Sequence, residues 1–183
     1  MSKVMIELLD HEPDMQSFSC GVPSIDNMIS EAYLNHLIRK SMTFQIKILG
    51  HNVGYYQLVI ANVTMEGTEL PFGDYGSGEN RYGVLSIRFL AIKKEIQKKG
   101  IGTLVLREIL KEARELSTRW PIRVVYIEAL PDKVPWYREI GFEILKDASD
   151  DNFGLVPMFF EMMSTHDKES IEDYCSSQYT QLK

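Results

Sequence analysis

The chain has 183 residues, of which 44% are hydrophobic and 25% charged, and a formal net charge of −6. This size and composition predict one globular domain with a substantial core, and no apolar run is long enough to cross a membrane, so no membrane partner is expected. The acidic balance argues against broad nonspecific nucleic-acid binding, and the lack of a signal-peptide core predicts a cytoplasmic location.

A series of short apolar runs rich in β-branched residues predicts an α/β chain with many strands. The hairpin signal Gly50-His51-Asn52 separates two of these runs. Residues 64–80 are rich in glycine and acids, which predicts a long functional loop. The last twenty residues are polar and acidic, with a helical turn expected near 169–175. Strands are expected at residues 4–9, 42–49, 53–63, 82–92, 122–130, 142–145 and 155–163.

Helical patterns separate some of these strands. Ser24 is expected to cap a single helix that runs to about Ile38. An amphipathic helix is expected at 101–116, and a short one at 134–140, which ends at Gly141. The strand before residue 101 and the strand after residue 121 flank the amphipathic helix, so they should be parallel and joined by a right-handed crossover.

The cysteines and histidines show no metal-site or disulfide spacing. We therefore expect free thiols and no metal. A weaker alternative makes Cys20 a covalent nucleophile that is activated by His11 or His36, although nothing in the spacing supports a poised thiolate. A buried, inert cysteine is the commoner case.

The junction between the 82–92 strand and the helix at 101 carries the pair Gly100 and Gly102, preceded by Lys98 and Lys99. A helix N-terminus directs unpaired N–H groups and a positive dipole toward a ligand, and glycine allows close approach, so this junction predicts a phosphate or pyrophosphate site. No glycine precedes Lys-Ser or Lys-Thr, and Val105 stands where a dinucleotide fingerprint needs its third glycine. Both common nucleotide motifs are therefore disfavoured.

Gln97, Gly100 and Gly102 match the Gln/Arg-x-x-Gly-x-Gly/Ala signature of the GCN5-related N-acetyltransferase (GNAT) family, and 90–92 resembles the strand that precedes it. Tyr137, three variable residues and then Gly141-Phe142 resemble a second motif of that family. The resemblance implies a mixed, mostly antiparallel sheet whose central parallel pair is splayed to admit acetyl coenzyme A (acetyl-CoA), flanked by helices. The domain would occupy residues 1–163, followed by a polar tail at 164–183.

The resemblance also implies the reaction, in which the acetyl group of acetyl-CoA passes to a primary amine by direct attack in a ternary complex. It gives Tyr137 the role of general acid toward the leaving sulfur, and a phenol with an ordinary pKa near 10 is protonated at neutral pH. The loop amides would hold the pyrophosphate and the strand edge the pantetheine arm. The expected cofactor-binding residues are Leu90, Ala91, Ile92, Gln97, Lys98, Lys99, Gly100, Ile101, Gly102 and Thr103.

The general base is open. Many family members carry an acid on the central strand, but between residues 84 and 92 this chain has only Ser86 and Arg88 as polar candidates. Glu128 on the neighbouring strand is the nearest carboxylate candidate, and a water chain is equally admissible. The position of a frequent family asparagine is filled by 130–132 (Leu-Pro-Asp), which weakens polar contacts to the pantetheine there. Other carboxylates that could reach in from the long loop are Glu66, Glu69, Asp74 and Glu79.

Three segments, at 18–21, 25–26 and 53–58, resemble the family's toxins that acetylate the amino group of aminoacyl-tRNA. The acidic balance fits tRNA poorly, although Arg39-Lys40 offers a modest basic patch. A small amine, an antibiotic, a protein N-terminus or a lysine remain alternative acceptors. A different class, a non-catalytic acetyl-CoA-binding module, is favoured by the missing base and opposed by Tyr137. A homodimer is also compatible with the sequence.

Overall fold

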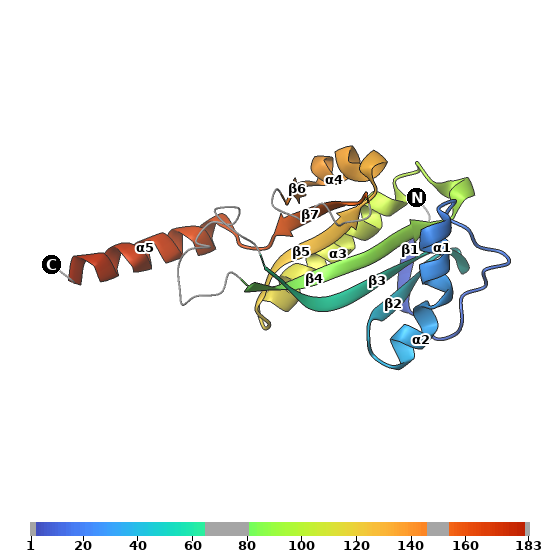
Figure 1. The fold of residues 1–183 in the computed structure, drawn as a ribbon, viewed down its shortest axis with the longest axis horizontal. Helices are drawn as coiled ribbons and strands as arrows, with labels where there is room; N and C mark the ends of the chain where they lie inside the picture. Colours follow the sequence, from blue (N-terminus) through green and yellow to red (C-terminus); the bar gives the residue numbers. More distant parts are fainter. Residues whose placement is uncertain (1–2, 65–80, 146–153, 182–183) are drawn as a thin grey trace.

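A computed structural model of the chain describes residues 3–64, 81–145 and 154–181, and its centre is one seven-stranded sheet (Figure 1). The strand order is β1-β2-β3-β4-β5-β7-β6, and every neighbouring pair is antiparallel except β4 and β5. The predicted mixed sheet with a central parallel pair is confirmed. The strands are β1 (Val4–Leu8), β2 (Met42–Ile48), β3 (His51–Thr64), β4 (Arg81–Ile92), β5 (Ile122–Ala129), β6 (Glu143–Ile144) and β7 (Val156–Glu161).

Helix α3 (Ile101–Ser117) covers the far face of the sheet in Figure 1, where it packs on β4 and β5. Its buried residues recur at three- and four-residue spacing, so they form one apolar stripe that the sheet covers. Helix α4 (Val134–Ile140) joins the same core, and α1 (Pro23–Ser30) and α2 (Ala32–Leu37) lie on the near face. The stripe consists of Val105, Leu106, Ile109, Leu110 and Ala113.

The predicted hairpin between β2 and β3 is confirmed. Leu49 and Gly50 form its turn, with φ values of 52° and 79°. Positive φ at two successive residues is typical of the tight turns that match the twist of paired strands. This turn fixes the register of β3 against β2, and β3 pairs with β4 along its other edge.

The single helix expected from Ser24 to Ile38 is wrong in two respects. Val22 is the N-cap and Pro23 the first helical residue, because proline's fixed φ suits that position. The helix then ends at Ser30, whose hydroxyl donates to the carbonyl of Asn27 at 2.7 Å. Such a bond competes with the helical ladder, so a second helix, α2, begins separately at residue 32.

The C-terminal segment forms a long helix, α5 (Thr165–Gln181), rather than the single turn expected. Ser164 and Asp167 explain its start, because each side chain accepts a hydrogen bond from the other's backbone N–H, at 2.8 and 3.1 Å. Lys168 pairs with Glu161 of β7 at 2.8 Å, which ties the first turn to the sheet. Beyond that turn α5 extends away from the domain (Figure 1).

Candidate active site

The parallel strands β4 and β5 separate part-way along their length. Their pairing ends at Ile87 and Ile127, yet β4 continues along β3 to Ile92 and β5 continues along β7 to Ala129. Arg88 is skipped in the β3–β4 register and forms a bulge at this point. The bulge bends β4 where it parts from β5, and this opens a gap between the two central strands.

The edge of β4 that faces this gap offers backbone hydrogen-bonding groups. Lys93 donates its N–H to the carbonyl of Val53 on β3 at 2.9 Å. Successive residues of a strand direct their peptide groups to opposite edges, so those of Leu90 and Ile92 face away from β3 and toward the gap. The Ile92 carbonyl accepts a bond from the Gln97 side chain at 2.8 Å. The peptide group of Leu90 can therefore bind an extended ligand as an added strand.

The connection from β4 to α3 passes through a short 3₁₀ turn, η2 (Lys94–Ile96), and then through two residues with left-handed backbone, Lys98 at φ 60° and Gly100 at φ 79°. A Cβ on Gly100 would meet nothing within 4 Å. Glycine is thus favoured there by its backbone conformation, and the space beside it is open.

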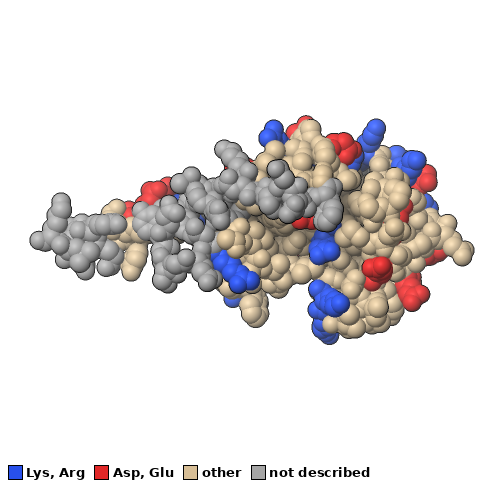
Figure 2. All heavy atoms as spheres, in the orientation of Figure 1, with Lys and Arg blue, Asp and Glu red and all other residues tan. Residues whose placement is uncertain are grey.

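The N-terminus of α3 exposes the donors that an anion needs. The first helical bond runs from Leu104 N–H to the Gly100 carbonyl at 3.0 Å. The N–H groups of residues 101–103 consequently lack an intrahelical acceptor, and they meet the positive end of the helix dipole. Lys98 and Lys99 are exposed beside them. In Figure 2, Lys and Arg side chains appear at this end of the molecule among several acids.

Gln97 holds this loop in place. Its side-chain amide nitrogen donates to the carbonyls of Ile92 and Cys20, both at 2.8 Å. Asp26 fixes the segment around Cys20, since its carboxylate accepts hydrogen bonds from the Ser19 hydroxyl at 2.7 Å and the Cys20 N–H at 2.9 Å. Burial acts to raise the pKa of Asp26, but these hydrogen bonds bring it below its usual value. Gln97 is one of the residues expected to bind the cofactor, and in this structure its amide nitrogen contacts the protein's own backbone.

Aromatic residues of α4 join it to the start of α3. The indole N–H of Trp136 donates to the Thr103 hydroxyl at 3.0 Å. The Trp136 and Tyr137 rings lie 4.5 Å apart, and Tyr137 meets Phe142 edge-on at 5.4 Å. Tyr137 is therefore fixed beside the first turn of α3 and in the main core.

Tyr137 is only 6% exposed, and its burial raises the pKa of the hydroxyl above the ordinary value of 10. Within the part of the chain that the structure describes, its hydroxyl makes no hydrogen bond. The group is thus a protonated donor whose hydrogen is free for a ligand. That state is the one that a general acid requires before it acts.

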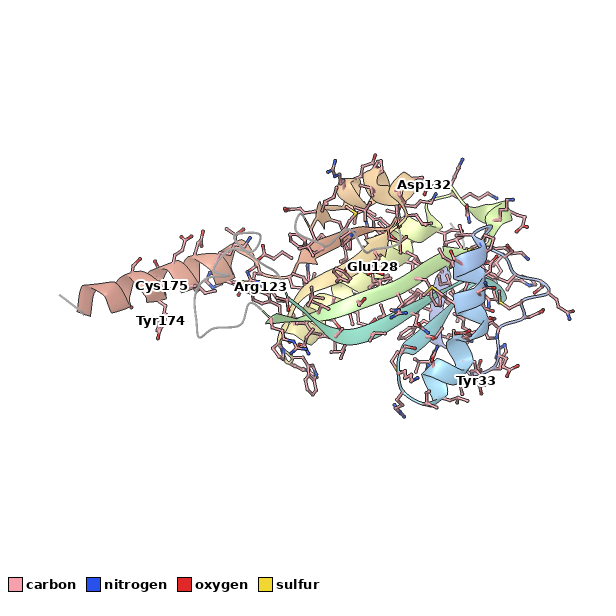
Figure 3. The ribbon with its side chains drawn as sticks, viewed as in Figure 1. Tyr33, Arg123, Glu128, Asp132, Tyr174 and Cys175 are labelled. Atoms are coloured by element: carbon pink, nitrogen blue, oxygen red, sulfur yellow. The ribbon has the colours of Figure 1, made fainter. Side chains whose placement is uncertain are left out.

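Glu128 is on β5 (Figure 3), and Tyr137 belongs to the core on the α3 side of the sheet. Its neighbours Ile127 and Ala129 belong to the core beneath α3, and side chains alternate along a strand, so Glu128 points to the other face, where it is exposed. The Tyr126 hydroxyl approaches its carboxylate at 3.5 Å. Burial, followed by the charge of Glu128, raises the pKa of Tyr126 to about 12. The four loop carboxylates named above, at 66, 69, 74 and 79, lie outside the described residues.

The structure does not support the nucleophilic alternative for Cys20. Burial, followed by the nearby Asp26, raises the pKa of this thiol to about 11. The His11 ring contacts Asp10, and His36 Nδ1 accepts the backbone N–H of Thr43 at 3.1 Å, so neither imidazole contacts the thiol.

Among residues 3–64, 81–145 and 154–181 no group of three or more His, Cys, Asp or Glu side chains is arranged to hold a metal ion. None of the described helices is long and apolar enough to cross a bilayer.

The profile of the acetyltransferase (GNAT) family matches residues 8–142. The chain belongs to this family. The acetyltransferase therefore uses acetyl-CoA as its co-substrate and acetylates an amine.

Among curated proteins, this acetyltransferase is similar to a tRNA-acetylating toxin of Mycobacterium tuberculosis, with 27% identity over 133 residues, which is 72% of this chain and 79% of the relative. The solved structure of AtaT complexed with acetyl-methionyl-tRNAfMet is similar at a TM-score of 0.73 and 19% identity, covering 93% of this chain and 98% of that one. A variant of KacT gives a TM-score of 0.74 at 17% identity, covering 92% and 98%. At such identities the solved structures establish the common fold.

Proposed function

We propose that this acetyltransferase acetylates the amino group of an aminoacyl-tRNA. The observation that carries the proposal is its similarity over 72% of its length to a protein named as a tRNA-acetylating toxin. The structure supports the proposal further. The segment at 18–21, which resembles the toxins, contains Cys20, and the Gln97 side chain donates a hydrogen bond to the Cys20 carbonyl. That resemblance therefore involves the part of the protein that supports the glycine turn.

In the proposed complex the pyrophosphate of acetyl-CoA accepts hydrogen bonds from the first turn of α3, and the pantetheine arm pairs with the open edge of β4. This arrangement places the thioester in the gap between β4 and β5. The residues that we assign to acetyl-CoA contacts are Leu90, Ala91, Ile92, Lys98, Lys99, Gly100, Ile101, Gly102 and Thr103. Gln97 supports them from behind as a positioning residue.

The amine nitrogen attacks the thioester carbonyl carbon, the carbon–sulfur bond breaks, and the acetyl group becomes an amide. A strand-edge N–H near Leu90 stabilises the developing oxyanion. Tyr137 gives its proton to the departing sulfur, and the nitrogen loses one proton to a base. We assign the base to Glu128, because it lies across the sheet from Tyr137. The amine can then approach from one face while the thiol leaves on the other.

The acidic net charge of the chain sets how tRNA is bound. Lys and Arg side chains are scattered over the near face in Figure 2 rather than gathered in one large patch. Few phosphates can then be neutralised together, so we expect a shallow dependence of tRNA affinity on salt concentration. Recognition is concentrated at the aminoacyl end. We further propose that the reaction takes place in the cytoplasm.

The test is to incubate the protein with acetyl-CoA and a panel of aminoacyl-tRNAs, digest the RNA, and detect N-acetyl-aminoacyl-adenosine by mass spectrometry. Deacylated tRNA, a polyamine, an aminoglycoside and a lysine peptide serve as parallel acceptors. Acetylation of aminoacyl-tRNA alone supports the proposal. Acetylation of another amine instead assigns the acceptor to that class, and binding of acetyl-CoA without transfer to any acceptor supports a non-catalytic binding module.

A further inference from the structure

A second concave site lies away from the gap between β4 and β5. It is a groove of about 380 Å³ between α3 and the edge of the sheet formed by β1 and β2. Its floor is apolar and comes from three strands, and its wall is one side of α3. The groove plays no part in the acetyl transfer proposed above.

The floor is built to receive an apolar or planar group. The rings of Phe44 and Tyr56 stack at 4.7 Å with an angle of 8° between their planes. Ile6 and Leu8 of β1 extend this floor toward the sheet edge, and Leu8 is 49% exposed. Aromatic faces attract cations, and a guanidinium stacks on them well.

The wall is acidic. Glu108, Glu112 and Glu115 are spaced by four and three residues, so they lie on one stripe of α3, about 10 Å long at 1.5 Å per residue. Lys111 also lines the groove, which leaves the acids in excess. Among the described residues none of the three glutamates forms an ion pair. Partial burial, followed by the charge of Glu115, raises the pKa of Glu112.

Tyr56 provides an independent observation. This side chain is 1% exposed, yet its hydroxyl makes no hydrogen bond within the part of the chain that the structure describes. Burial, followed by the negative charge of Glu112, raises the pKa of Tyr56, so the hydroxyl lies near the acidic wall. This oxygen is not among the fully buried, unpartnered polar atoms of the described residues, so it opens into the groove, where a ligand can bond to it.

We propose that this groove binds a cationic segment of a partner protein, with an arginine or lysine side chain over the Phe44–Tyr56 stack and against the glutamate wall. The sheet edge favours a protein segment over a free polyamine. β1 is the terminal strand of the sheet, so its outer backbone groups are open to an added strand. Alternate side chains of such a strand point to the same face as Ile6 and Leu8.

The test uses a fluorescein-labelled eight-residue peptide of alternating arginine and isoleucine, titrated with the full-length protein and followed by fluorescence anisotropy. The groove variant is E108Q/E112Q/E115Q. The matched control is E169Q/E172Q/D173N, which removes the same number of negative charges from exposed positions of α5. We expect binding to weaken about tenfold in the groove variant, because three charge pairs are lost, and less than twofold in the control.

Four results would overturn the proposal. The groove variant could bind as tightly as the wild type. Both variants could weaken equally, which would indicate nonspecific attraction. A peptide with citrulline in place of arginine could bind equally well, which would remove the need for a cation. Spermine, titrated alone, could show the dependence on the groove variant that the arginine peptide lacks, and this would make the occupant a polyamine. Circular dichroism checks that each variant is folded.

Discussion

The side chain of Gln97 donates to the backbone carbonyl of Cys20 at 2.8 Å, across 77 positions of the chain. A second bond from the same nitrogen, to Ile92, joins the end of β4 to this pair. The glutamine thus connects an N-terminal segment, the central strand and the glycine turn. Gln97 therefore holds the glycine turn in shape through its hydrogen bonds to the protein backbone.

Replacing Gln97 by alanine should weaken acetyl-CoA binding about five- to thirtyfold, because two hydrogen bonds worth about 1 kcal/mol each are lost and the turn loosens. Calorimetric titration with acetyl-CoA measures the change. Gln16→Ala is the matched control, since that glutamine is exposed. Equal affinities for the Gln97 and Gln16 variants would show that the turn holds its shape without this contact.

Gly100→Ala separates backbone strain from ligand contact. Gly100 and Gly50 both have φ 79°, and a Cβ would meet nothing within 4 Å at either position. Both alanine variants should therefore lose about 1–2 kcal/mol of unfolding free energy from the left-handed conformation. Only Gly100→Ala should also lose acetyl-CoA affinity, because its methyl group enters the proposed pyrophosphate space. Urea unfolding and calorimetry give the two quantities, and a parallel loss of affinity in Gly50→Ala would contradict the assignment.

Cys20 should react slowly in the folded protein. Its pKa is raised to about 11, so the thiol stays protonated at neutral pH, and the reactive thiolate appears only as the pH rises toward that value. At pH 8.5 the smaller thiolate fraction alone predicts roughly 75-fold slower alkylation than for a thiol with a pKa of 9. Mass spectrometry after iodoacetamide treatment, with and without urea, measures the rate at this residue. Fast alkylation without urea would point to a poised nucleophile after all.

The sequence was sufficient where local chemistry decides the structure. The βαβ unit followed from a strand, a glycine turn and the apolar stripe of α3, and Gly141 ended α4 as expected, with φ 109°. The hairpin formed where Gly50 predicted it, because glycine accepts positive φ, but its turn is Leu49-Gly50, and His51 and Asn52, expected in the turn, already pair in β3. Each of these signals lies within a few residues of the structure that it specifies.

Other features depend on contacts between distant segments or on competing local bonds. The bulge at Arg88 arises from the register of β4 against β3, and no local residue pattern marks it. The carbonyl of Cys20 became a partner of Gln97 only through folding, since backbone carbonyls carry no sequence signal. The start of α5 could have been predicted, because the spacing of Ser164 and Asp167 is that of a capping box.

The most direct test of the account is the rate of thiol release from acetyl-CoA in Tyr137→Phe, at saturating aminoacyl-tRNA. Tyr33→Phe is the control. Tyr33 is on α2, on the other face of the sheet from α3, and its hydroxyl contacts the Asp10 carbonyl. We predict a fall in kcat of about 10²–10⁴-fold for Tyr137→Phe, with little change in acetyl-CoA affinity, because only proton donation to sulfur is lost. The raised pKa also predicts that the wild type does not lose this donor up to pH 10. A Tyr137→Phe enzyme as fast as the Tyr33→Phe enzyme would contradict the proposed mechanism.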